Sequence, residues 1–117
     1  MHMPPDRSEQ ESEILSPHRR EELQRAAVEL TARLLQKGLE VSAEEDPALL
    51  ADLLSAVERF ENAVINRGGD PMVNMPTSSE PQDPAFVLPQ RRADEGISQY
   101  IRHVNEAAEM LEVPRTL

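Results

Sequence analysis

The chain has 117 residues, with 22 Asp and Glu against 12 Lys and Arg, so its formal net charge is −10. It contains no cysteine, which excludes disulfide frameworks, thiolate zinc sites and thiol nucleophiles. The excess of acid argues against nucleic-acid binding, because the neutralisation of phosphates requires a basic surface. We therefore expect a partner other than DNA or RNA.

The hydropathy pattern disfavours two further classes of protein. No apolar run approaches the roughly 20 residues that a membrane-spanning helix needs. The N-terminus lacks the apolar core of a signal peptide. We therefore expect a cytoplasmic protein without a membrane segment, and the predominance of arginine over Lys37, the only lysine, suggests a GC-rich bacterial genome.

Residues 1–15 form an acidic tail that is rich in proline, serine and glutamate. Such a composition offers too little apolar surface to offset the entropy that is lost when a chain becomes ordered. We expect this tail to be disordered and residues 16–117 to form a single helical domain.

The first predicted helix covers residues 17–37. Ser16 suits its N-cap, Pro17 its first position, and Gly38 the left-handed conformation that ends a helix. One face carries an apolar stripe, made of Leu23, Ala26, Ala27, Leu30 and Leu34. The opposite face carries charges of alternating sign at a spacing of four, which is typical of a solvated face. These charges belong to Glu21, Arg25, Glu29 and Arg33.

The second predicted helix covers residues 47–66, with Asp46 as its N-cap and a glycine pair after its end. Its apolar side chains cover roughly 200° of the helical wheel, about twice the width of an ordinary surface helix. They are Leu49, Leu50, Leu53, Leu54, Ala56, Val57, Phe60, Ala63, Val64 and Ile65. So wide an arc needs neighbours on two sides, so we place this helix at the centre of the fold.

The third predicted helix covers residues 94–112, because Pro114 prevents its continuation. It has one narrow apolar stripe, made of Ile97, Ile101, Val104, Ala108 and Leu111. Three helices of similar length favour a small all-α bundle. We expect the first two to form an antiparallel hairpin and the third to pack on the other side of the second.

A proline-rich arm, residues 67–92, separates the second and third helices and holds five of the ten prolines. A loop this long is unusual inside a compact domain and is generally either functional or disordered. The arm contains two short apolar islands, which we take as candidate interaction residues. They are Met72, Val73, Met75, Phe86, Val87 and Leu88.

Glu61 is the residue whose placement most needs an explanation, because it falls inside the apolar arc of the second helix. An ionised carboxylate is almost never fully buried unless it is paired. In an antiparallel hairpin, Arg19 and Arg20 come within about a turn of Glu61. We therefore predict an ion pair between Glu61 and these arginines at the edge of the core, and leave a metal or catalytic carboxylate as the alternative.

The metal alternative would combine Glu58, Glu61 and His103. Carboxylate-bridged sites in helix bundles use a Glu-x-x-His motif on each of two helices. Here His103 and Glu106 occur in the reverse order, and they occur once. We therefore expect no metal and no other cofactor.

Nucleophilic catalysis also lacks a motif, because no serine lies in a Gly-x-Ser-x-Gly elbow. The sequence therefore favours a small non-catalytic interaction or regulatory protein over an enzyme, and the alternative is a small metal-dependent enzyme. A thin core with three aromatic residues predicts a homodimer. We expect the third helix or the islands of the arm to contact the second copy.

Overall fold

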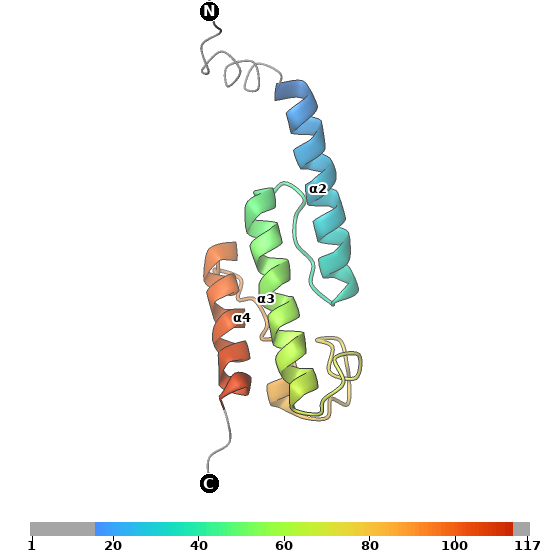
Figure 1. The fold of residues 1–117 in the computed structure, drawn as a ribbon, viewed down its shortest axis with the longest axis vertical. Helices are drawn as coiled ribbons and strands as arrows, with labels where there is room; N and C mark the ends of the chain where they lie inside the picture. The colour runs from blue at the N-terminus through green and yellow to red at the C-terminus, as the bar shows by residue number, and fades with distance from the viewer. Residues whose placement is uncertain (1–15, 114–117) are drawn as a thin grey trace, which may run out of the picture.

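The computed structural model of the protein describes residues 16–113. This part of the chain contains helices and no strand, and its elements are α2 (Ser16–Gln36), α3 (Pro47–Asn66), the short 3₁₀ helix η1 (Pro84–Phe86) and α4 (Ile97–Glu112) (Figure 1). The predicted all-α fold with three main helices is confirmed. The predicted tail of residues 1–15 lies outside the described residues, as do residues 114–117.

Local signals in the sequence set the bounds of α3. The Asp46 carboxylate accepts a hydrogen bond of 2.9 Å from the backbone N–H of Ala48 and so caps the N-terminus. At the other end, Gly68 adopts a φ of 83°, a left-handed conformation that favours glycine. The predicted bounds of 47–66 are confirmed for this reason. Gly38 ends α2 in the same way, with a φ of 89°.

The start of α4 was predicted three residues too early, at 94 instead of Ile97. The carboxylate of Glu95 accepts a hydrogen bond of 3.0 Å from the backbone N–H of Arg92. The backbone N–H of Glu95 in turn donates to the carbonyl of Arg92, also at 3.0 Å. These two bonds close a turn that takes the place of the first helical turn, and the helix begins only after Gly96.

α2 and α3 run in the same direction, so the predicted antiparallel hairpin is wrong (Figure 1). Arg33 lies 3.4 Å from Glu58, and Lys37 lies 2.7 Å from Glu61. Residue numbers therefore increase together along the two helices, which is the signature of a parallel pair.

The segment 38–46 explains the parallel arrangement, because it returns along α2 instead of closing a tight turn. Leu39 and Val41 pack against the core, whereas Glu40 between them is exposed. This alternation is that of extended backbone. Residues 39–42 are free of turns; four extended residues reach about 13 Å, which is somewhat less than half the length of the 21-residue α2, and a turn at 43–44 then leads into α3. The connection therefore starts α3 beside the middle of α2 (Figure 1).

α4 is also parallel to α3 (Figure 1). Arg59 donates to the side-chain oxygen of Asn105 at 3.2 Å, and just after the end of α3 the Nε of Arg67 donates to the carbonyl of Leu111 at 2.7 Å. A second bond of 2.7 Å from Arg67 reaches the carbonyl of Val113. Arg67 thus satisfies carbonyls that the end of a helix leaves without partners.

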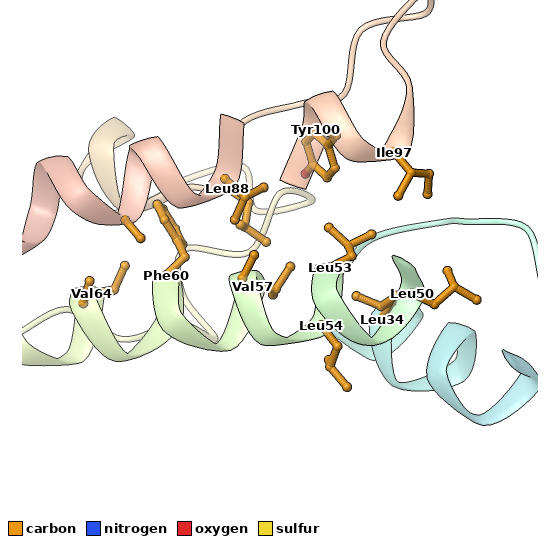
Figure 2. Packing of buried hydrophobic residues seen from close by; sticks show 14 of the residues in the cluster. Leu34, Leu50, Leu53, Leu54, Val57, Phe60, Val64, Leu88, Ile97 and Tyr100 are labelled. Carbon is orange, nitrogen blue, oxygen red and sulfur yellow. The ribbon is translucent and has the colours of Figure 1, made fainter. Parts of the chain in front are cut away.

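The core forms around α3, which lies between α2 and α4 as predicted (Figure 1). Leu34 from α2, Tyr100 from α4 and Leu88 from the arm join the side chains of α3 in one cluster (Figure 2). This explains the wide apolar arc of α3, since two helices and the arm cover it. Within the described residues, none of the helices combines the length and apolar character that crossing a bilayer requires.

Candidate functional site

The ion pair of Glu61 exists, but its partner is Lys37. The Nζ of Lys37 donates to Oε1 of Glu61 at 2.7 Å, and the two side chains are only 22 % and 25 % exposed. The prediction that Arg19 or Arg20 would pair with Glu61 is wrong, because it assumed an antiparallel hairpin. In the parallel arrangement these arginines lie at the opposite end of α2 and are exposed.

A surface hollow of about 350 Å³ lies beside this ion pair. The arm forms one wall of the hollow, with Pro71, Met72 and Met75 facing Lys37 and Glu61. The Lys37 ammonium already neutralises the carboxylate of Glu61. The hollow therefore offers thioether and methylene surface beside a closed ion pair, which suits contact with an apolar side chain.

A smaller cavity of about 20 Å³ lies beneath the arm, and Lys37, Glu61 and Met75 line it as well. Its apolar walls include Phe60 and Phe86. The cavity has room for about one water molecule. The ion pair and the arm therefore enclose very little empty space, and the arm packs closely on the ends of α2 and α3.

Asn74 fixes the arm in this position, and it is the buried polar residue that sequence reasoning missed. Its Nδ2 donates to the carbonyl of Asp70 at 2.8 Å and to Oε1 of Gln82 at 2.9 Å. Its Oδ1 accepts a bond of 2.8 Å from the backbone N–H of Gln82. Gln82 also accepts from the backbone N–H of Asp70 at 3.0 Å. Two stretches of the arm are thus clamped through one amide group, and such a network rigidifies a loop.

Close packing at Gly69 holds the arm in a second place. A side-chain carbon at this position would lie 2.6 Å from Val64 and 2.7 Å from the ring of Phe86. Real carbon atoms do not approach so closely, so only glycine lets the ring of Phe86 pack on the end of α3. The loop therefore begins with its backbone pressed against the core.

The candidate interaction residues of the arm divide into two groups. Leu88 is buried in the core and Phe86 packs against it, so both residues stabilise the fold. Val87 and Met75 are half-buried. Met72 and Val73 are exposed, and they remain free to contact a partner. The first apolar island of the arm is thus the accessible one.

The end of the arm is tied to α4 by Tyr100, which is buried and whose hydroxyl donates to the carbonyl of Pro89 at 2.7 Å. Burial raises the pKa of Tyr100 to about 12, with a smaller contribution from the negative charge of Glu95. The ring meets that of His103 edge to face, with centroids 6.3 Å apart. This aromatic pair and the hydrogen bond fix the point where the arm returns to the helices.

The structure does not bring together the three residues of the metal hypothesis. Glu58 faces Arg33 and Glu61 faces Lys37, while His103 lies 3.4 Å from Glu95. Within residues 16–113 no group of three or more histidine or carboxylate side chains is arranged to hold a metal ion. The metal hypothesis relied on spacing within each helix, whereas the structure gives each of these three side chains a separate partner.

Comparison of the chain with protein-family models, with curated proteins and with solved structures finds no match.

Proposed function

We propose that this protein is a non-catalytic protein-interaction module whose arm presents Met72 and the neighbouring hollow to an apolar side chain of a protein partner. The proposal rests on the order of the arm and the exposure of Met72. The buried amide of Asn74 holds the arm in place, whereas Met72, two residues away, is 75 % exposed at the rim of the hollow. Loops that a rigid scaffold holds in place are where binding residues are most often found.

The order of the arm, the chemistry of methionine and the charge of the chain all suit the binding of a protein partner. A surface that is fixed before binding loses less conformational entropy when a partner docks. Methionine is flexible and polarizable, and it adapts to apolar side chains of different shapes. The net charge of −10 favours encounter with a partner that is basic around its apolar contact.

A photo-crosslinking amino acid at position 72 tests this proposal in cells of the source organism. Position 110 provides the control, because Met110 on α4 is 76 % exposed and lies outside the hollow. We expect a discrete crosslinked protein from position 72 and none from position 110. The same protein should lose its association with the full chain when Met72→Asp is introduced, but not with Met110→Asp. Equal adducts from both positions, or none from position 72, would contradict the proposal.

The choice of point variants follows from the structure. Removal of the whole arm would also remove Leu88 and Phe86 from the core and would unfold the protein. Met72 is exposed, so its replacement by Asp should leave the free energy of unfolding within about 0.5 kcal/mol of the original. Loss of binding in this variant would then be a direct effect on the surface.

A further inference from the structure

The N-terminal half of α2 extends beyond the start of α3 (Figure 1). Residues 18–25 are exposed all around the helix, whereas Ala27 and Leu34 are buried against the rest of the molecule. Most of the stability of a protein helix comes from packing of one face, because isolated helices of this length are marginal in water. The projecting turns therefore lack the packing that the remainder of α2 has.

A second apolar stripe on α2 faces away from α3. It consists of Val28, Ala32 and Leu35, which follow the i, i+4, i+7 spacing of one helix face. Val28 and Leu35 are 57 % and 56 % exposed. Together with Glu40 and Val41 of the returning segment, they line an open groove of about 460 Å³.

The charges beside this stripe specify the orientation of an occupant that would complement them. Glu21, Arg25, Glu29 and Arg33 alternate in sign along α2. Read backwards, the order − + − + becomes + − + −, so a second copy of the same helix complements the ladder when it lies antiparallel. A parallel copy in register would place like charges opposite each other, which is unfavourable.

We infer that a second copy of this chain docks antiparallel on the exposed face of α2, with the two-fold axis at the level of Ala27. In this register Arg25 of each copy lies opposite Glu29 of the other, and the two Val28 side chains approach each other. The projecting residues 18–25 of each copy lie beside the C-terminal half of the other α2. One arrangement therefore covers both the projecting turns and the exposed stripe.

This interface is independent of the proposed function, because the hollow at Met72 lies at the C-terminal end of α2 and uses other residues. It also differs from the dimer expected from the sequence, which used the third helix or the arm. The failure of either proposal leaves the other intact.

Charge reversal in trans tests the antiparallel register with the full chain. Arg25→Glu alone and Glu29→Arg alone each place like charges across the two-fold axis, and each should weaken self-association by about tenfold or more. An equimolar mixture of the two variants restores opposite charges at both contacts and should form a heterodimer. Sedimentation velocity measures the species, and circular dichroism of each variant checks that α2 is retained. A monomeric original protein at about 200 μM, or a mixture no more associated than its components, would overturn the inference.

A disulfide test gives a second, independent readout, because the chain has no native cysteine. Val28→Cys places one thiol beside the two-fold axis and should form a covalent dimer under mild oxidation. Met110→Cys, at an equally exposed position on α4, is the matched control and should remain monomeric. Crosslinking of Met110→Cys at the same rate as Val28→Cys would overturn the inference.

Discussion

The ammonium of Lys37 lies 2.7 Å from the carboxylate of Glu61, and this contact links the C-terminal end of α2 to the last turns of α3. The two groups can meet only because the helices run in the same direction. The same arrangement places the arm over the ends of both helices, so the ion pair becomes one wall of the hollow at Met72. The parallel arrangement of α2 and α3 thus also determines where the candidate site lies.

Loss of the Lys37–Glu61 pair should destabilise the protein moderately. Both side chains are about three-quarters buried, so Glu61→Ala leaves the Lys37 ammonium partly desolvated and without its partner. We expect the free energy of unfolding, measured by urea denaturation, to fall by about 1–2 kcal/mol.

The pair between Arg33 and Glu58 provides the control for this experiment. It is longer, at 3.4 Å, and both side chains are about half exposed. Glu58→Ala should therefore cost less than about 1 kcal/mol. A larger loss from Glu58→Ala than from Glu61→Ala, or an effect of Arg19→Ala equal to that of Glu61→Ala, would contradict the assignment of Lys37 as the partner.

Gly69→Ala should destabilise the junction between α3 and the arm. The added carbon would lie 2.6 Å from Val64 and 2.7 Å from the ring of Phe86, so one of these side chains must move. Overpacking of this kind costs about 1–3 kcal/mol. Gly96→Ser is the comparison, since open space surrounds Gly96 and serine is a better N-cap for α4. Thermal melts should show a lower midpoint for Gly69→Ala and an unchanged or slightly higher one for Gly96→Ser.

Tyr100 should make the stability of the protein depend on pH in the alkaline range. Its pKa is about 12 in the folded protein and about 10 in an unfolded chain. Between these values the unfolded chain releases a proton that the folded protein keeps, so the free energy of unfolding falls as the pH rises. The slope from this group is about 1.4 kcal/mol per pH unit. Below pH 10 Tyr100 is protonated in both states, so its full contribution to the free energy of unfolding is present.

Tyr100→Phe isolates this effect. The variant loses the hydrogen bond to Pro89, which should cost about 1 kcal/mol at neutral pH. Because phenylalanine does not titrate, the advantage of the original protein should shrink as the pH rises from 10 to 12. A stability difference that stays constant from pH 8 to pH 12 would show that Tyr100 is not buried as described.

Asn74→Ala should release the arm. The substitution removes three hydrogen bonds and leaves the backbone N–H of Gln82 without its acceptor, at a cost of about 1–3 kcal/mol. Compared with the original protein, the variant should show faster amide hydrogen exchange in residues 70–82, with a smaller change in α3. Asn62→Ala, at an exposed position of α3, should change neither the free energy of unfolding nor the exchange rates of the arm. Unchanged exchange in the arm of the Asn74→Ala variant would argue against the clamp.

Elements that depend on local chemistry could be predicted from the sequence. Asp46 and Pro47 begin α3 and Gly68 follows its end, because caps and turn residues act on the backbone within a few positions. The start of α4 could not be predicted, since Glu95 closes a turn with Arg92 that competes with helix formation. Ordinary capping residues do not show which of two such local structures is the more stable.

The direction of α2 relative to α3 depended on a weaker signal. Leu39 and Val41 alternate with Glu40, and this pattern of extended backbone could have indicated that the segment returns along α2. Because the direction was predicted wrongly, Arg19 and Arg20 were given the role that Lys37 has. Asn74 carried no sequence signal, because its partners depend on how the arm folds back on itself.

Backbone order parameters from ¹⁵N relaxation of the full chain show whether the arm is a fixed surface that presents Met72. We expect values of about 0.85 for Met72, Asn74 and Gln82, equal to those of α3. Asn74→Ala should lower the order parameters in the arm alone. Order parameters below about 0.6 at Met72, Asn74 and Gln82 in the original protein would show that the arm is not a fixed surface.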